Sequence, residues 1–366
     1  MEGGKPTADA RSGLKLVRHP ASRLFGPRAR APRSGLKIRL PFKRGRYAGD
    51  MKFLVTGGAG FIGSHVCEML LREGHGVVAL DDLNPFYEVA LKQRNLRDLQ
   101  KLALPFSFVQ GDLLDGAALD ETFSLGPFDQ IIHLAARAGV RPSLEAPALC
   151  QRVNVEGTVN VLEWARRAGT RKVTIASSSS VYGVNSRLPF SETDPVASPI
   201  SPYAASKLAC ESLGHVYHHV YGFDVAMLRF FTVYGPRQRP DLAIHKFARL
   251  MHAGRPIPVF GDGASARDYT YIDDILQGVM ACTRQSFGFE IFNLGESQTV
   301  TLNLLIELLE AALGRKAVIE RLPSQPGDVP ATWADITKAS DRLGYRPKTR
   351  IEEGIPLFIE WFKGTV

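Results

Sequence analysis

Short apolar runs alternate with stretches of helical period along residues 51–231. The first run, 51–56, precedes a helical pattern that ends near residue 72, and a second apolar run follows at 77–80. Later runs are 106–110, 129–134, 172–177 and 225–230, with helical patterns at 151–168 and 201–221. Continuous apolar runs are typical of strands buried on both faces, and their alternation with helices predicts a parallel sheet. We therefore predict an α/β fold, a doubly wound, Rossmann-type parallel sheet.

The alternation loosens from about Thr232, where shorter elements rich in proline and glycine begin. We expect residues 51–231 to form the Rossmann domain and residues 232–366 to form mainly a smaller, substrate-binding C-terminal lobe. Some late elements are expected to return to the main sheet. No apolar run reaches the roughly 18 residues that a membrane-spanning helix needs, so we expect no membrane segment.

Residues 1–50 differ from the rest of the chain. They hold 13 Lys/Arg and three acids and lack amphipathic periodicity, so we expect a disordered basic tail. Subtracting their net +10 from the chain's +8 leaves −2 for residues 51–366, which argues against nucleic-acid binding by the folded part. A nucleic-acid tail and a transit peptide are alternatives. We favour a start at Met51, with residues 1–50 an upstream extension that is not native.

The first strand leads into a glycine loop, 57–63, and the second strand closes at Asp81. Strand, glycine loop, helix, strand and terminal acid make the dinucleotide-binding fingerprint. The glycines let the backbone approach a pyrophosphate, and Asp81 can accept hydrogen bonds from the adenosine ribose hydroxyls. An acid at this place repels a 2′-phosphate, so we expect NAD rather than NADP. The alternative is a tight strand-to-helix turn that binds nothing.

Ser201 and Pro202 predict a helix start, which places Tyr203 and Lys207 four residues apart on one face. A nearby ammonium favours the phenolate form of a tyrosine, which can then take a proton from a sugar hydroxyl. Alone, this pair could equally be two surface residues. It gains weight from the serine run that begins at Ser177, since ligands of such sheets bind beyond the carboxyl ends of the strands.

The four cysteines, Cys67, Cys150, Cys210 and Cys282, are scattered without the spacing of metal ligands. Reduced thiols are typical of cytosolic proteins, so we expect a cytoplasmic protein with no metal site.

Five motifs together resemble the extended short-chain dehydrogenase/reductases of the nucleotide-sugar epimerase/dehydratase family. They are the glycine loop, the serine run 177–183, the Tyr203/Lys207 pair, RFFTVYGP at 229–236 and RDYTYIDD at 267–274. The resemblance spans residues 51–363. It implies an enzyme that binds NAD and a nucleotide sugar and forms a homodimer.

The resemblance also implies roles for individual residues. Ser178 would bind the sugar 4-hydroxyl beside Tyr203, and Lys207 would also hold the nicotinamide ribose. Cofactor contacts are implied for Gly57, Gly60, Phe61, Ile62, Gly63, Asp81, Asn84, Asp112, Leu113, Leu134, Ala135, Ala136, Asn154, Tyr203, Lys207 and Phe231. Substrate contacts are implied for Arg141, Ser178, Ser179, Thr232, Arg239, Arg267 and Asp328. Asn154 could instead be a polar residue inside a helix, and Arg267 a solvated loop cation.

The serine run separates reaction types within this family. Dehydratases resemble Thr-Asp-Glu at the positions of Ser178, Ser179 and Ser180, and decarboxylases place Glu where Ser180 stands. Serine at all three positions indicates that oxidation at C4 is followed only by reduction, which is epimerisation.

Segments 82–87, 91–93, 138–141, 237–242 and 325–330 most resemble the UDP-glucuronate 4-epimerases, although 85–86 and Trp333 depart from the commoner residues. We therefore expect conversion of UDP-glucuronate to UDP-galacturonate through a 4-keto intermediate. A UDP-glucose 4-epimerase is the close alternative. A UDP-glucuronate decarboxylase and a non-catalytic NAD sensor are more distant ones.

The substrate carboxylate needs a cationic or multiply hydrogen-bonded partner. Arg141 and Arg239 each follow a predicted strand and are our candidates, with Thr232 adding a hydroxyl. The homodimer is expected to pair helices 151–168 and 201–221. Apolar positions on these helices fit either a core or an interface: Val155, Val159, Leu162, Leu208 and Leu213.

Overall fold

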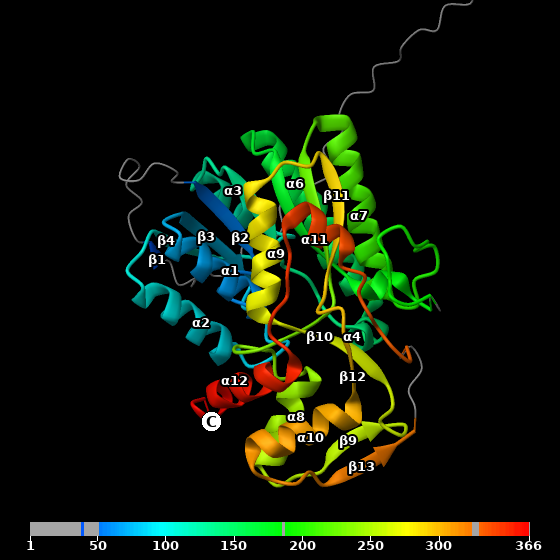
Figure 1. Cartoon of the computed structure of the whole chain (residues 1–366). Helices are drawn as coiled ribbons and strands as arrows, with labels where there is room; N and C mark the ends of the chain where they lie inside the picture. Colours follow the sequence, from blue (N-terminus) through cyan, green and yellow to red (C-terminus); the bar gives the residue numbers. More distant parts are fainter. Residues whose placement is uncertain (1–37, 40–50, 185–186, 324–328, 366) are drawn as a thin grey trace, which may run out of the picture. The chain divides into compact units, whose positions relative to one another are not determined.

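The computed structural model describes residues 38–39, 51–184, 187–323 and 329–365. Its central element is an eight-stranded sheet with the order β1-β4-β3-β2-β5-β6-β7-β11, in which β1 is Ile38–Arg39 (Figure 1). The strands are β2 (Lys52–Thr56), β3 (Gly76–Asp81), β4 (Phe106–Gln110), β5 (Gln130–His133), β6 (Lys172–Ser178), β7 (Asp224–Phe230) and β11 (Phe289–Leu294). These seven are parallel, which confirms the doubly wound α/β prediction.

Helices cover both faces of this sheet. The helices are α1 (Phe61–Arg72), α2 (Val89–Lys101), α3 (Gly116–Ser124), α6 (Gly157–Ala168), α7 (Pro202–Tyr221) and α9 (Ile272–Arg284). Alternate residues of β2 serve the two faces. Phe53 and Val55 pack into the core that contains residues of α1, α2 and α9, whereas Leu54 packs into the core that contains residues of α3, α6 and α7. Two separate cores explain why the strands read as continuous apolar runs.

The edge of the sheet beyond β4 involves the basic tail. Ile38–Arg39 form β1, which pairs antiparallel with β4. These two residues are therefore placed in a strand, contrary to the expectation of disorder throughout 1–50. The remainder of that prediction lies outside the described residues.

The C-terminal part adds two small sheets, β12-β10-β8 and β13-β9. Its strands are β8 (Thr232–Tyr234), β9 (Ile257–Phe260), β10 (Ala266–Tyr271), β12 (Thr299–Thr301) and β13 (Ile319–Leu322), and its helices are α8 (Ala243–His252), α10 (Leu302–Leu313), α11 (Thr337–Leu343) and α12 (Ile351–Lys363). Figure 1 shows α8, α10, β9 and β13 gathered at one end, while α9 and β11 return to the main sheet as expected. The exact division at residue 231 stays a prediction.

The helix predicted over 151–168 proves to be three segments. It comprises α5 (Pro147–Gln151), a π-helical turn at Arg152–Glu156 and then α6. The predicted helix is therefore present, but it begins earlier and contains a π-helical turn that was not predicted, because one extra residue leaves the apolar pattern almost unchanged. Such turns occur frequently at functional sites. Within the described residues, we find no helix that is both long and apolar enough to cross a membrane.

Candidate active site

The glycine loop between β2 and α1 is folded so tightly that side chains do not fit. Gly57 has a φ of +71°, and its N–H donates to the Leu80 carbonyl at 2.7 Å. A Cβ on Gly57 would lie 2.9 Å from the Ala135 nitrogen, and one on Gly63 would collide with the Gly57 backbone. The loop thus leaves the N-terminus of α1 open to a phosphate, whose charge that end of a helix stabilises.

A cavity of about 590 Å³ opens beyond the carboxyl ends of the central strands. This volume suits a small-molecule site. The cavity brings together most residues that the sequence predicted for the site: Gly57, Gly60, Phe61, Ile62, Gly63, Asp81, Asn84, Asp112, Leu113, Leu134, Ala135, Ala136, Ser178, Ser179, Tyr203, Lys207, Phe231, Thr232 and Arg239.

Asp81 ends β3 and forms part of the cavity wall. It is 6% exposed and pairs with Lys92 of α2 at 2.9 Å. The backbone N–H groups of Leu83 and Ala59 also donate to its carboxylate, at 2.9 and 3.3 Å. Burial raises the pKa of Asp81, while the Lys92 ammonium acts in the opposite direction. The carboxylate is therefore held in place where ribose hydroxyls can donate to it.

The start of α7 is capped from two sides. The Oγ of Ser201 accepts a hydrogen bond from the Ala204 N–H at 3.1 Å, as the sequence predicted. The Tyr203 N–H donates to the Oγ of Ser143 at 3.1 Å, and Ser143 belongs to the short helix α4 (Val140–Glu145). Because the first N–H groups of a helix lack partners within it, these two hydroxyls fix the turn that carries Tyr203.

Lys207 lies one turn further along α7 and is 4% exposed. Its Nζ donates to the Ala176 carbonyl of β6 at 2.7 Å and lies 6.0 Å from the centre of the Tyr203 ring. The helix therefore places the ammonium and the phenol on one side, as the four-residue spacing predicted.

The serine run leaves β6 at Ser178 and continues as a 3₁₀ turn, Ser179–Tyr182. The Ser178 Oγ accepts the Ser180 N–H at 3.1 Å and lies 3.1 Å from the Ser180 Oγ. Ser178, Ser179 and Ser180 all line the cavity, so the wall beside Tyr203 carries three hydroxyls at these positions.

A buried ionic network lies behind this wall. Glu211 of α7 pairs with Arg229 of β7 through two hydrogen bonds of 2.9 and 2.8 Å. The Ser177 Oγ donates to Glu211 at 2.6 Å, and Arg229 donates to the Tyr182 hydroxyl at 2.9 Å. The network thus fixes α7 against the two strands whose ends carry the serines and Phe231.

Asn154 does not line the cavity, although we expected a cofactor contact there. Asn154 lies in the π-helical turn and is 1% exposed. Its side-chain amide accepts a hydrogen bond from the Arg137 N–H at 2.7 Å and donates one to the Arg137 carbonyl at 3.2 Å. It also donates to the Ser206 Oγ at 2.8 Å. In this structure Asn154 supports the segment after β5 instead of forming the cavity surface.

The predicted substrate residues are distributed unevenly. Arg239 lines the cavity, whereas Arg141 lies outside its lining, with its guanidinium 4.7 Å from the centre of the Phe260 ring. Arg267 is also outside, donating to the Ala266 carbonyl at 2.8 Å. Asp328 lies outside the described residues.

Sequence reasoning missed two supporting residues, Lys92 and Ser143. Lys92 was noted only within the segment 91–93, where its charge and the nearby Asp81 were the available signal. Ser143 had no local signal, because its partner Tyr203 is 60 residues away.

The fold and the placement of Tyr203, Lys207 and Ser178 beside a dinucleotide loop define an extended short-chain dehydrogenase/reductase. Among families of this class, the chain belongs to the GDP-mannose 4,6 dehydratase family, whose model matches residues 54–357.

Three known proteins are similar to this chain over nearly their whole length. A UDP-glucuronate 4-epimerase of Thermodesulfobacterium geofontis is 45% identical over 315 residues, covering 86% of this chain and 97% of the relative. The crystal structure of UDP-glucuronic acid 4-epimerase from Bacillus cereus, in complex with UDP-glucuronic acid and NAD, gives a TM-score of 0.81 at 37% identity and covers 86% of this chain and all of that one. The crystal structure of UDP-glucose 4-epimerase from Thermotoga maritima with UDP-glucose gives a TM-score of 0.79 at 34% identity. It covers 86% of this chain and 99% of that one.

Proposed function

We propose that this protein is an NAD-dependent 4-epimerase that interconverts UDP-glucuronate and UDP-galacturonate. The observation that carries the proposal is the meeting of Tyr203, Lys207 and Ser178 in one cavity with the glycine loop and Asp81. The relatives named above support the same reaction and cofactor.

The residues present fit NAD. The crowded glycines leave space for a pyrophosphate at the start of α1, and the fixed Asp81 carboxylate suits an unphosphorylated ribose. Lys207 can donate to the second ribose with the N–H groups that the Ala176 carbonyl does not use. When bound, NAD supplies reversible hydride acceptance at C4 of the sugar.

Tyr203 is the proton acceptor in this proposal. Its phenolic oxygen takes the proton of the sugar 4-hydroxyl, and the adjacent Lys207 ammonium stabilises the negative charge before transfer. Ser178 donates to or accepts from the same oxygen. After the 4-keto sugar turns, the hydride would return to the opposite face of C4 while Tyr203 returns the proton to the 4-oxygen, so the reaction has no net oxidation.

The three hydroxyls of Ser178, Ser179 and Ser180 favour epimerisation over the other reactions of the family. Elimination needs a carboxyl group that protonates a leaving hydroxyl, and these positions supply none. A decarboxylase would carry Glu at 180. The absence of such an acid therefore favours return of the hydride to the keto sugar over elimination or assisted decarboxylation.

Arg239 and Thr232 are the candidates for holding the sugar carboxylate from within the cavity. Arg239 already forms a two-point ion pair with Asp241, at 3.0 and 2.6 Å, so a carboxylate substrate has to share that guanidinium. Arg141 needs a side-chain movement to reach the cavity. Contacts of Arg267 with the diphosphate and of Asp328 with the nucleotide ribose remain part of the proposal.

A homodimer through α6 and α7 is also proposed. Val155, Val159, Leu208 and Leu213 are half-buried, whereas Leu162 is fully buried and belongs to the core. Val216 and Val220 of α7 are 46% and 59% exposed, which leaves an apolar strip for a partner helix. A cytoplasmic location is proposed from the four buried, unpaired thiols.

The proposal is tested with purified protein in two steps. Heat denaturation should release NAD, measured enzymatically in the supernatant at close to one per chain. The native protein should interconvert UDP-glucuronate and UDP-galacturonate, resolved by chromatography. Turnover of UDP-glucose alone would replace the substrate assignment with UDP-glucose 4-epimerase, and bound NAD without turnover of either sugar would favour the sensor alternative.

A further inference from the structure

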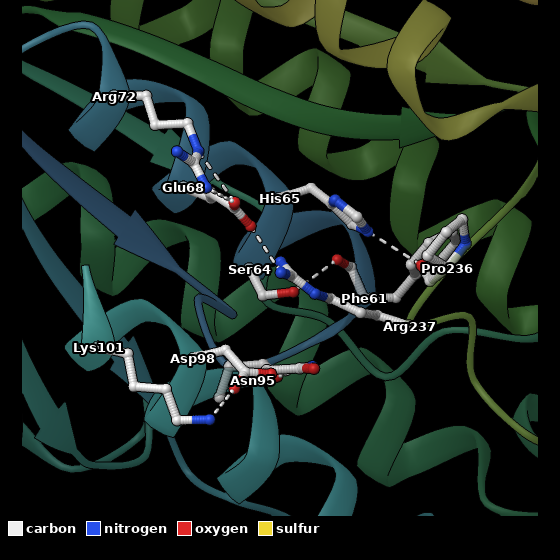
Figure 2. A network of polar contacts seen from close by, with 11 residues as sticks. Phe61, Ser64, His65, Glu68, Arg72, Asn95, Asp98, Lys101, Pro236 and Arg237 are labelled. Atoms are coloured by element: carbon white, nitrogen blue, oxygen red, sulfur yellow. Dashed lines mark hydrogen bonds and ion pairs between the residues drawn. The ribbon is translucent and has the colours of Figure 1, made fainter. Parts of the chain in front are cut away.

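The segment between β8 and α8 is anchored on the glycine-loop helix α1. Figure 2 shows Glu68 of α1 between two guanidinium groups, those of Arg72 and Arg237. Arg237 Nη2 lies 2.6 Å from Glu68 Oε2. One turn earlier on α1, His65 Nε2 donates to the Pro236 carbonyl at 2.9 Å. Two consecutive residues of the segment are thus fastened to two positions of one helix.

Arg237, which anchors the segment through Glu68, has a strained backbone and a buried N–H donor that lacks a hydrogen-bond partner among the described residues. Arg237 has a φ of +63°, in the left-handed region that residues with a Cβ seldom occupy. Its side chain is 15% exposed, and its Nη1 is buried without a hydrogen-bond partner among the described residues. A strained residue with an unpartnered buried donor is poorly explained as a stabilising feature, and such outliers concentrate at functional sites.

Glu68 would not be left without a cation if Arg237 were absent. Arg72, on the same helix, donates to the other oxygen, Oε1, at 3.0 and 2.8 Å. Because the exposed Arg72 already satisfies the carboxylate, the separate bond to Arg237 serves to locate the segment.

The segment delivers Arg239 into the cavity two residues after the anchor. The Arg239 guanidinium pairs with Asp241, lies 3.5 Å from the Ala138 carbonyl oxygen and sits 5.3 Å from the centre of the Phe86 ring. Gln238, between the two arginines, is 1% exposed, and its carbonyl lies 2.6 Å from the Nδ1 of His245. The chain therefore has little freedom between the anchor and Arg239.

We propose that Glu68 and Arg237 are positioning residues, which fix Arg239 relative to the glycine loop and so set the affinity for the nucleotide sugar. The proposal rests on the proposed function for the identity of its ligand. One helix, α1, then locates both sides of the site: its first turn lines the cavity, and its second turn holds the segment that carries Arg239.

The test compares Glu68→Gln, Arg237→Gly and a matched control, Arg72→Ala, which removes the other cation from the same carboxylate. Arg237→Gly removes the anchor and also relieves the backbone strain at φ +63°, so we expect this variant to fold. Each change is placed in a Tyr203→Phe background, and the Kd values of UDP and UDP-glucuronate are measured by calorimetry. Loss of a positioning contact is expected to weaken binding of UDP-glucuronate by about tenfold in the first two variants. The control should bind like the parent, and NAD content should be unchanged in all.

In the enzyme with Tyr203 intact, the same two variants should raise KM more than they lower kcat. A lower melting temperature with unchanged Kd for both UDP and UDP-glucuronate would show that the anchor is only structural, and would overturn the inference. The Kd measurements need no turnover. Absence of turnover by the native protein would therefore contradict the proposed function alone.

Discussion

Glu211 and Arg229 form a two-point ion pair beneath the serine run, with both side chains almost completely removed from solvent. Their side chains are 5% and 2% exposed, and they join the middle of α7 to the end of β7. Burial disfavours the charge of Arg229, but the hydrogen bonds to Glu211 raise the pKa of Arg229 above its ordinary value. The Arg229 guanidinium therefore has a matched hydrogen-bonding partner in the buried place where it lies.

Glu211→Ala should lower the free energy of unfolding by about 3–5 kcal/mol, because it leaves the Arg229 charge buried and unpaired. Urea unfolding followed by circular dichroism measures this. Asp98→Ala, which breaks the exposed pair of Asp98 with Lys101 on α2, is the control and should cost about 0.5 kcal/mol or less. Equal losses in the two variants would mean that the buried pair has no special role.

Tyr203→Phe should lower kcat by roughly 10²–10⁴-fold, since loss of a general acid–base group typically has that effect. Folding and NAD content should be retained, because the backbone bond from Tyr203 to Ser143 does not involve the phenol. Single-turnover assays with UDP-glucuronate give the rate. Near-native turnover in this variant would remove Tyr203 from the proposed mechanism.

Arg239→Ala should weaken the binding of UDP-glucuronate more than the binding of UDP-glucose. The difference in binding free energy should be about 2–5 kcal/mol if the sugar carboxylate is left buried and unpaired. Arg141→Ala is predicted to show the same preference, although its guanidinium starts outside the cavity lining. Kd values for both sugars, measured in parallel, decide between carboxylate and diphosphate roles. Equal losses with both sugars would assign these arginines to the diphosphate or to structural ion pairs.

Stability should fall as the pH is lowered below about 6.5, in part because of His133. Burial, with a smaller contribution from Lys207, lowers the pKa of His133 to about 3. Below the unfolded value of 6.5, the unfolded chain binds a proton that the folded chain does not, which costs about 1.4 kcal/mol per pH unit.

The pH effect is measured by urea unfolding between pH 7 and pH 4.5. His133→Gln should make the slope of unfolding free energy against pH shallower by about one proton. A slope identical in the native protein and His133→Gln would show that His133 accepts a proton in the folded state.

A shortened chain that begins at Met51 should match the full chain in melting temperature and activity if residues 1–50 are not part of the fold. The pairing of β1 with β4 is the feature that this comparison tests. A clear loss of either property would show that the tail contributes to the fold.

Local patterns were sufficient to predict six of the seven parallel strands, all but β11, and the family resemblance implied many of the residues that line the cavity. Each of these six strands is an apolar run, and Gly57, Asp81 and Ser178 lie at strand ends that the fold brings to one edge. The Tyr203/Lys207 pair needed only a helix, whose cap at Ser201 is visible in the sequence. These features depend on residues close together in the chain, or on a topology with few alternatives.

Contacts between distant segments could not be predicted in this way. Ser143 meets Tyr203, and Glu68 meets Arg237, across 60 and 169 residues. The π-helical turn was missed because one extra residue barely changes the hydrophobic period. Asn154 lies in this turn, accepts a hydrogen bond from the Arg137 N–H and stands outside the cavity lining.

The bond from Lys207 to the Ala176 carbonyl has a consequence for the energetics of cofactor binding. Immobilising a lysine side chain costs up to about 2 kcal/mol of conformational entropy. The Ala176 carbonyl of β6 already restrains the Nζ of Lys207, so this entropy is lost when the protein folds. Binding of a ribose therefore causes little further loss of side-chain entropy. The ligand meets a rigid donor, so more of the enthalpy of its new hydrogen bond appears as affinity, and the cofactor should leave slowly between turnovers.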